Sequence, residues 1–271
     1  MRPRAGSSAK ALLLTLLGEF VLPAGGAAWT QSLVGSLASL GVGEPNARQA
    51  IARLSEQGLV AGRRLGRRTR WALTPEGTQL LVDGTRRIYQ FGSAGAGWDG
   101  RWLLVVYSTP ASERAQRERL RSRLAFAGFG FLGATVAITP HLDREPLANR
   151  ALEDLDVVAG SFVVRAEAGD LVPAEELVHR AWDLESLASS YRAFVTGFAP
   201  LAPDTPAACF ASLVQLVHAW RRFPFIDAEI PGPLLPPGWP GGAAKRLFDE
   251  LHAAWSPAAR AYYGALEAAN A

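Results

Sequence analysis

Apolar residues near the amino terminus recur with the period of an α-helix. The positions that share this spacing are Ala9, Leu12, Leu13, Leu16, Leu17 and Phe20. They fall on one face, which predicts an amphipathic helix. The arginines, apolar run and small residues over residues 2–28 also suit a secretory signal peptide. The helical spacing argues against that alternative, so we expect a cytoplasmic protein.

The next two segments predict a helix-turn-helix. Residues 27–30 are typical of a short edge strand, and Thr30 is expected to cap a helix that ends at Gly41. Pro45 then stands in the first turn of a third predicted helix, which ends before Gly58. Two short helices joined by a tight glycine turn are typical of DNA-binding helix-turn-helix units.

The third predicted helix presents a polar stripe. Its apolar positions, at i, i+3, i+4 and i+7, are Ala47, Ala50, Ile51 and Leu54. If these face the core, then Asn46, Gln49 and Arg53 point outward, with Arg48 on the flank. Asn and Gln can pair with adenine edges, and Arg with guanine or phosphate. We expect these four residues to contact DNA; a solvated polar face is the alternative for any one of them.

Residues 59–73 predict a two-stranded ribbon that turns at Gly66. Within eight residues the ribbon carries Arg63, Arg64, Arg67, Arg68 and Arg70. So dense a cluster repels itself unless solvent or phosphate compensates the charge. An arginine-tipped ribbon after a recognition-type helix is typical of the wing of a winged helix. A solvated basic turn is the alternative.

Residues 101–165 predict the order β-α-β-β-α-β of a ferredoxin-like sandwich. A glycine-rich linker over 92–100 precedes them. The expected elements are a strand over 101–107, a helix from Ser112 to about 127, strands within 129–139, a helix over 146–155 and a strand over 157–165.

We expect no cofactor and no metal. Residues 128–133 match the G-x-G-x-x-G pattern of dinucleotide sites, but that motif needs a strand before it and a helix after it. Here the predicted order is inverted. His179 and Asp183, four residues apart on a predicted helix, could share a metal, but an ordinary surface pair is the favoured interpretation.

The last hundred residues predict a helical domain. Helices are expected over 173–198 and 205–222 and as two segments within 242–266, with an irregular proline-rich wrap over 223–241. The predicted fold class is therefore α+β in three domains. These are a winged helix-turn-helix domain over 1–91, a ferredoxin-like dimerisation domain over 98–172 and a helical effector or structural domain over 173–271.

Charge is unevenly distributed along the chain. Residues 1–90 hold 12 Lys and Arg against 5 Asp and Glu, a net charge of +7, whereas residues 91–271 hold 16 against 20, a net charge of −4. This asymmetry indicates a polyanion-binding module attached to a mildly acidic body. The single cysteine, Cys209, suits a reducing compartment.

Several segments resemble the PaaX family of phenylacetate-catabolism repressors. They are residues 12–26, 98–102, 129–131 and 221–225 with 234–241. The resemblance implies a winged helix, a middle domain similar to the small ferredoxin-like nucleases of CRISPR adaptation, and a helical carboxy-terminal domain. It also implies release from DNA by an aryl-CoA thioester such as phenylacetyl-CoA. By position, the family's DNA-reading helix falls on Asn46–Arg53 and its wing on Arg63–Arg70.

The effector site is a separate prediction, made from chemistry. A CoA ester presents several negative charges and flat rings, which guanidinium groups and aromatic faces can bind. The candidates are Trp220, Arg221, Arg222 and Phe223. The alternative is a helix end whose arginines pair with Asp227 or Glu229 and hold the proline-rich wrap.

We also expect a homodimer. One short recognition helix reads few base pairs, so specificity requires a second half-site set by two-fold symmetry. The predicted interface lies largely in residues 101–165.

Two enzyme classes are alternatives to a repressor. In the related nucleases, the first strand is expected to end in an aspartate. In this sequence Ser108, which follows Val105-Val-Tyr, stands in that place. A hydrolase would need a G-x-S-x-G elbow or a Cys/His arrangement, and the sequence shows neither. The expected function is therefore DNA-binding repression without enzymatic activity.

Overall fold

The computed structural model describes residues 8–92, 97–108, 113–169 and 171–271, and its contacts divide the chain into two compact units. The first unit contains Met1–Phe91, Phe194–Arg221 and Lys245–Ala271; the second contains Gly92–Ala193 and Arg222–Ala244. The three-domain division drawn from the sequence stays a prediction.

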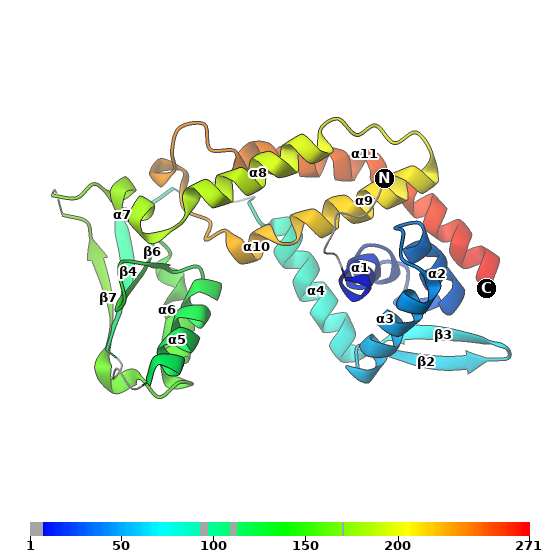
Figure 1. Ribbon diagram of the computed structural model, residues 1–271, viewed down its shortest axis with the longest axis horizontal. Coiled ribbons are helices and arrows are strands. Elements are labelled where there is room, and N and C mark those ends of the chain that lie inside the picture. The colour runs from blue at the N-terminus through cyan, green and yellow to red at the C-terminus, as the bar shows by residue number, and fades with distance from the viewer. Residues whose placement is uncertain (1–7, 93–96, 109–112, 170) are drawn as a thin grey trace. The chain divides into compact units, whose positions relative to one another are not determined.

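The amino-terminal part of the first unit has the order of a winged helix (Figure 1). Its three strands pair antiparallel in the order β1-β3-β2. The elements are α1 (Ala9–Leu16), the π-helical turn η1 (Leu17–Val21), β1 (Ala27–Trp29), α2 (Thr30–Ala38), α3 (Glu44–Glu56), β2 (Val60–Leu65), β3 (Arg68–Leu73) and α4 (Pro75–Gln90).

The prediction that Thr30 caps a helix is wrong. Trp29 occupies the cap position, and Thr30 is the first residue of α2. The Thr30 hydroxyl instead donates to the Thr69 carbonyl (3.0 Å) and accepts from Trp71 Nε1 (3.0 Å). The Thr30 side chain therefore binds the wing strand β3, whereas the sequence pattern predicted that it would cap α2.

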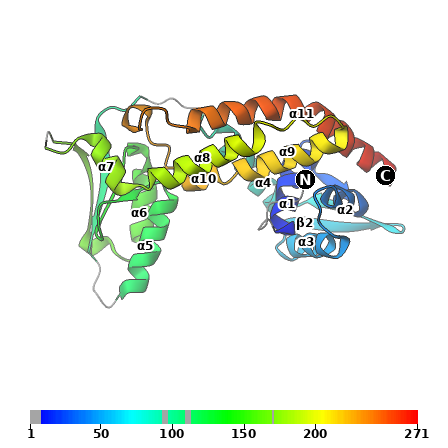
Figure 2. The same cartoon turned by 45° about the horizontal axis from the view of Figure 1, so that its top comes forward.

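Two carboxy-terminal helices complete the core of the winged helix. Helices α9 (Pro206–Trp220) and α11 (Gly241–Asn270) each place a ring against Phe20, whose centroid lies 4.9 Å from Phe210 and 5.3 Å from Tyr263. The Ser32 hydroxyl of α2 donates to the Leu266 carbonyl of α11 (3.2 Å). Figure 2 shows α9 and the end of α11 running alongside α1 and α2. These helices cover apolar surface that a free winged helix would expose to water.

Helix α11 corrects a second prediction, because it is one helix where two were expected. Pro257 lies inside it. A proline removes one helical hydrogen bond and costs about 3 kcal/mol, which burial of neighbouring side chains such as Trp255 and Ala259 can offset. No helix within the described residues is both long enough and apolar enough to cross a membrane.

A buried polar cluster joins α11 to the amino-terminal helices. Glu19, in the π-helical turn, accepts a hydrogen bond from the hydroxyl of Tyr89 on α4. Its other carboxylate oxygen lies 2.9 Å from Nε2 of His252 on α11. Because a buried carboxylate without partners is costly, this cluster specifies how α11 sits on the winged helix.

The second unit contains the predicted ferredoxin-like sandwich. Its strands pair antiparallel in the order β5-β6-β4-β7. The elements are β4 (Arg101–Tyr107), α5 (Arg114–Phe126), β5 (Gly130–Phe131), β6 (Val136–Thr139), the 3₁₀ turn η3 (Leu142–Arg144), α6 (Glu145–Glu153), the 3₁₀ turn η4 (Val158–Gly160) and β7 (Ser161–Glu167). Residues 93–96 of the predicted linker and Ser112, the predicted helix start, lie outside the described residues.

The rest of the second unit differs from its prediction in two places. The helix expected over 173–198 breaks into α7 (Ala174–Ala181) and α8 (Leu184–Phe198), so His179 and Asp183 do not share a helix. The proline-rich segment, expected to be irregular, holds the short helix α10 (Phe223–Ile226) and the 3₁₀ turn η5 (Gly232–Leu234). Proline fits the first turn of a helix, where its missing N–H would have no partner anyway.

Candidate nucleic-acid interface

Helix α3 presents the polar stripe that its sequence predicted. Ala47, Ala50, Ile51 and Leu54 are buried against α1 and α2, while Asn46, Gln49 and Arg53 are exposed. Gly41, with φ of 79°, makes the turn before the helix. The polar stripe therefore lies on a helix whose other face is fixed by the core, as a recognition helix requires.

Arg48, on the flank of that stripe, has a partner within the helix. Its Nε and Nη2 both lie 2.8 Å from Glu44 Oε1, one turn earlier. Both side chains are exposed, so the pair contributes little to stability. A phosphate could take over the guanidinium at small cost.

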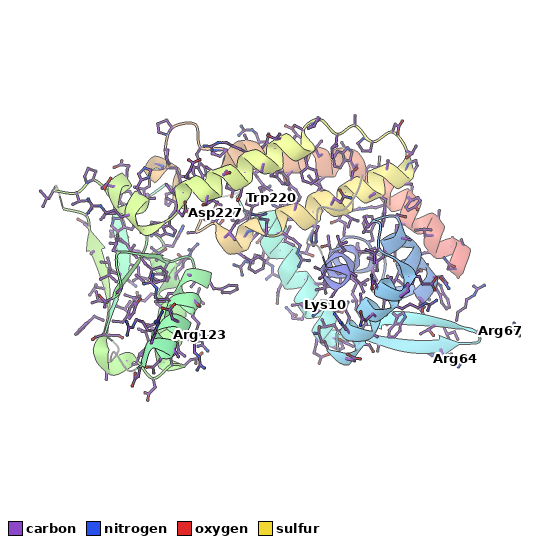
Figure 3. All side chains as sticks on the ribbon, viewed as in Figure 1. Lys10, Arg64, Arg67, Arg123, Trp220 and Asp227 are labelled. Carbon is purple, nitrogen blue, oxygen red and sulfur yellow. The ribbon has the colours of Figure 1, made fainter. Side chains whose placement is uncertain are left out.

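The wing is a tight hairpin of β2 and β3. The pairing of Leu65 with Arg68 leaves Gly66 and Arg67 as the two turn residues, and Gly66 has φ of 62°. A glycine first in a two-residue turn matches the twist of the flanking strands. Figure 3 shows Arg64 and Arg67 at the free end of this hairpin. Both arginines are exposed.

Strand pairing places like charges opposite each other. Arg63 on β2 is the direct partner of Arg70 on β3. Like charges in this position destabilise a sheet. Arg70 also lies 5.6 Å from the ring centroid of Trp29, its partner on β1, which stabilises one of the two guanidinium groups. A bound phosphate would relieve the remaining repulsion.

Arg68 is held by the carboxy-terminal helix. Its Nη1 donates to the carbonyl oxygens of Asn270 (3.0 Å) and Ala271 (2.7 Å). Carbonyls at the end of a helix attract cations. Of the five wing arginines, Arg68 and Arg70 therefore also help to position the wing.

The sequence interpretation missed the side chain that anchors the wing. Trp71 packs its ring over Gly62, where an added Cβ would lie 2.9 Å from the ring. Its N–H binds Thr30. The available signal was Gly62 itself, because a glycine inside a predicted strand marks a close approach.

The structure divides the four predicted effector residues between the two units. Trp220 is 0% exposed in the first unit, and its Nε1 donates to the Ile88 carbonyl (3.2 Å). Arg221, also in the first unit, donates to the Ala11 carbonyl (3.1 Å) and the Thr15 hydroxyl (3.0 Å).

The other two residues belong to the second unit. Arg222 donates to the Ser190 hydroxyl (3.2 Å), and Phe223 stacks on Tyr191 with centroids 4.3 Å apart. Of the two acids expected to pair with these arginines, Asp227 binds Tyr191 and Glu229 lies 3.7 Å from Arg144. Effector binding by the four residues stays a prediction.

His218 predicts how stability depends on pH. Its Nδ1 lies 3.2 Å from the Thr15 hydroxyl, and burial, with a smaller effect from Arg221, lowers its pKa to about 4. Unfolding restores the ordinary value of 6.5, so between pH 6.5 and about 4 the unfolded chain binds more protons. We therefore expect the free energy of unfolding to fall as pH falls through this window. Urea denaturation at pH 7 and pH 4.5 measures the change; His218→Gln should lessen it, and an equal change in both proteins would contradict the assignment.

The end of β4 differs from what a nuclease site would require. Ser108 follows this strand, and its N–H donates to the Gly160 carbonyl (2.9 Å). Within the described ranges, no three or more His, Cys, Asp or Glu residues gather in a group that could hold a metal ion. The residues described here thus offer no cluster for metal-assisted hydrolysis.

Comparison with known proteins identifies related chains along almost the whole length. Three family models match: "PaaX-like protein" over residues 8–77, "PaaX protein central Cas2-like domain" over 95–178 and "PaaX-like protein C-terminal domain" over 182–265. The transcriptional repressor PaaX of Escherichia coli (strain K12) is 28% identical over 273 residues, which cover 96% of this chain and 83% of the repressor.

A solved structure shares the fold. The uncharacterized protein Rv0674 from Mycobacterium tuberculosis superposes with a TM-score of 0.65 and 21% identity, covering 95% of this chain and 99% of that one. The matching order of the three family models and the full-length similarity to a repressor lead to one conclusion. The chain belongs to the PaaX-like family of transcriptional repressors.

Proposed function

We propose that this protein represses an aromatic-acid catabolic operon by binding operator DNA in the cytoplasm. Helix α3 would enter the major groove with Asn46, Gln49 and Arg53, while the wing contacts the backbone. The single observation that carries the proposal is the exposed polar stripe of α3 beside an arginine-tipped hairpin. The proposed pathway, of the phenylacetate type, is the one that the sequence resemblance implies.

Release from DNA would come from an aryl-CoA thioester such as phenylacetyl-CoA. A ligand shifts the equilibrium only if it binds the DNA-free form more tightly than the DNA-bound form. A tenfold loss of DNA affinity corresponds to about 1.4 kcal/mol of coupling. The proposed repression and release require neither a nucleotide cofactor nor a metal.

The ferredoxin-like sandwich offers an apolar surface for a homodimer. On the strand pair β4 and β7, Val106 faces Phe162 and Leu104 faces Val164. Phe162 is 68% exposed and Val164 is 45% exposed. Adjacent exposed apolar side chains on an edge strand are typical of an interface. We propose that a second copy of the chain covers them.

Introducing a charge on this surface should separate the dimer. We expect Phe162→Asp to sediment as a monomer at micromolar concentration, because two carboxylates would be buried without partners at a two-fold interface. Leu171→Asp, at an exposed apolar residue beyond β7, is the matched control and should sediment as the wild type. Sedimentation velocity distinguishes the two, and a dimeric Phe162→Asp would place the interface elsewhere.

Footprinting tests the function directly. The wild-type protein should protect one site with two half-sites in the DNA upstream of its own or neighbouring genes, and phenylacetyl-CoA should release it. Protection without release would support repression with another effector. Uniform binding to all DNA would contradict the proposal.

A further inference from the structure

A cavity of about 310 Å³ lies within the second unit, among the end of α7, the first half of α8 and the proline-rich segment. Trp182 and Trp239 contribute to its wall, together with Leu184 and Ala188 of α8 and Pro240. The two indoles, the aliphatic side chains and the proline form a part of the wall that suits a flat apolar group. The polar part of the lining consists of His179, Asp183, Glu185 and Arg192.

Each indole packs closely against a glycine. An added Cβ at Gly130 would lie 2.6 Å from the fused carbons of Trp182, and one at Gly241 would lie 2.7 Å from Nε1 of Trp239. The Trp239 ring also meets the edge of Tyr191, with centroids 6.1 Å apart at 79°. Close packing therefore limits the motion of both rings before any ligand arrives, which lowers the entropy cost of binding.

The Trp182 indole N–H is a donor in need of an acceptor. It is buried and has no hydrogen-bond partner in the part of the chain that the structure describes. A buried unsatisfied donor costs about 1–3 kcal/mol. Because Trp182 lines the cavity, a carbonyl oxygen on a ligand could remove that cost after a small shift of the ring.

The charged groups around the cavity are mixed in sign. Arg192 binds Glu185 (2.9 Å), and Asp183 accepts a hydrogen bond from the Ser186 N–H (3.0 Å). With its arginine already paired and two carboxylates nearby, the cavity favours an uncharged acyl group over a free carboxylate.

The volume of the cavity limits the size of the group that it can bind. Since a water molecule occupies about 30 Å³, the cavity holds on the order of ten water-sized groups, as many as the non-hydrogen atoms of one ring with a short acyl arm. A coenzyme attached to that arm would have to remain outside.

We propose that this cavity binds the acyl end of an aryl thioester, with the ring between the Trp182 and Trp239 walls. The inference rests on the proposed function for its effector class, and it places the effector apart from Trp220–Phe223. Helix α8 extends from this cavity into residues of the first unit, where Phe194 packs on Trp220 with centroids 5.3 Å apart. Ligand binding thus acts on a helix that continues into the DNA-binding unit.

Filling the cavity tests the proposal. Calorimetric titration of the full chain with phenylacetyl-CoA, phenylacetate and CoA compares the wild type with Ala188→Leu, which projects into the cavity, and with Ala193→Leu. Ala193 is an exposed position on the same helix and does not line the cavity, so it is the matched control. Trp182→Phe keeps an aromatic wall and removes the N–H together with one of the two fused rings, which provides a second variant if Ala188→Leu melts early.

The expected result is binding of the thioester at least tenfold tighter than of phenylacetate or CoA. Ala188→Leu should weaken it at least tenfold, Trp182→Phe about tenfold, and Ala193→Leu less than twofold. Equal thioester affinity in the wild type and both cavity variants, or no binding to the wild type, would overturn the assignment. Phenylacetate binding as tightly as the thioester would overturn the preference for an uncharged acyl group.

DNA affinity measured on the same samples separates this proposal from the proposed function. If the protein binds DNA but no thioester, the cavity is not the effector site, and the proposal that the protein is a DNA-binding repressor stands. If the thioester binds with the predicted variant pattern but the protein does not bind DNA, the proposed repressor function is wrong and the assignment of the cavity stands.

Discussion

Trp220→Ala is expected to lower the free energy of unfolding by about 3–5 kcal/mol, the usual cost of removing a buried tryptophan. The Trp220 ring stacks on Phe248 of α11 with centroids 4.8 Å apart and meets the edge of Phe91. Its N–H also satisfies the Ile88 carbonyl near the end of α4. Removing the ring therefore leaves a cavity where α4, α9 and α11 meet.

Chemical denaturation of the variant measures this loss, with Phe225→Ala as the control. Phe225 is half exposed, so its truncation should cost less than about 1 kcal/mol. A Trp220→Ala protein of wild-type stability that no longer binds phenylacetyl-CoA would contradict the structural role of Trp220. It would support the prediction that Trp220 binds the effector.

Loss of two wing-tip arginines is expected to weaken binding to every duplex alike. Arg64→Ala combined with Arg67→Ala removes two phosphate contacts, each contributing about 1 unit to the slope of log affinity against log salt. At about 1.4 kcal/mol for each contact, the double variant should bind operator and random DNA roughly 100-fold more weakly at low salt.

The control removes the same charge elsewhere. Arg114 and Arg119 are exposed on α5. Their double alanine variant should keep the wild-type slope within about half a unit if the wing, and not net charge, binds the backbone. Fluorescence anisotropy at four salt concentrations gives both slopes, and equal slopes in all three proteins would show that the wing does not touch phosphate.

The exposed stripe of α3 and the hairpin of β2 and β3 could be predicted from sequence because both are local patterns. The apolar period of Ala47, Ala50, Ile51 and Leu54 determines which face of α3 points outward, and Gly66 places the turn between two strands. The alternation of strands and helices over 101–165 likewise fixes the sandwich, since few chain paths satisfy that order.

The packing of α9 and α11 on the winged helix could not be predicted in the same way. Contacts such as Ser32 with Leu266 join residues more than 200 positions apart, and no local period encodes them. Tertiary packing also kept α11 continuous through Pro257. The sequence gives one sign of this packing, which is the acidic Glu19 within an apolar segment. The π-helical turn directs its side chain to His252.

The central claim, that α3 reads bases, is tested most directly by Gln49→Ala on two duplexes in parallel titrations. With the footprinted operator, the variant should lose about 1–3 kcal/mol of binding free energy, because a bidentate base contact disappears. With a random duplex of the same length it should bind within twofold of the wild type. An equal loss on both duplexes, or no loss on either, would contradict the orientation of α3 described above.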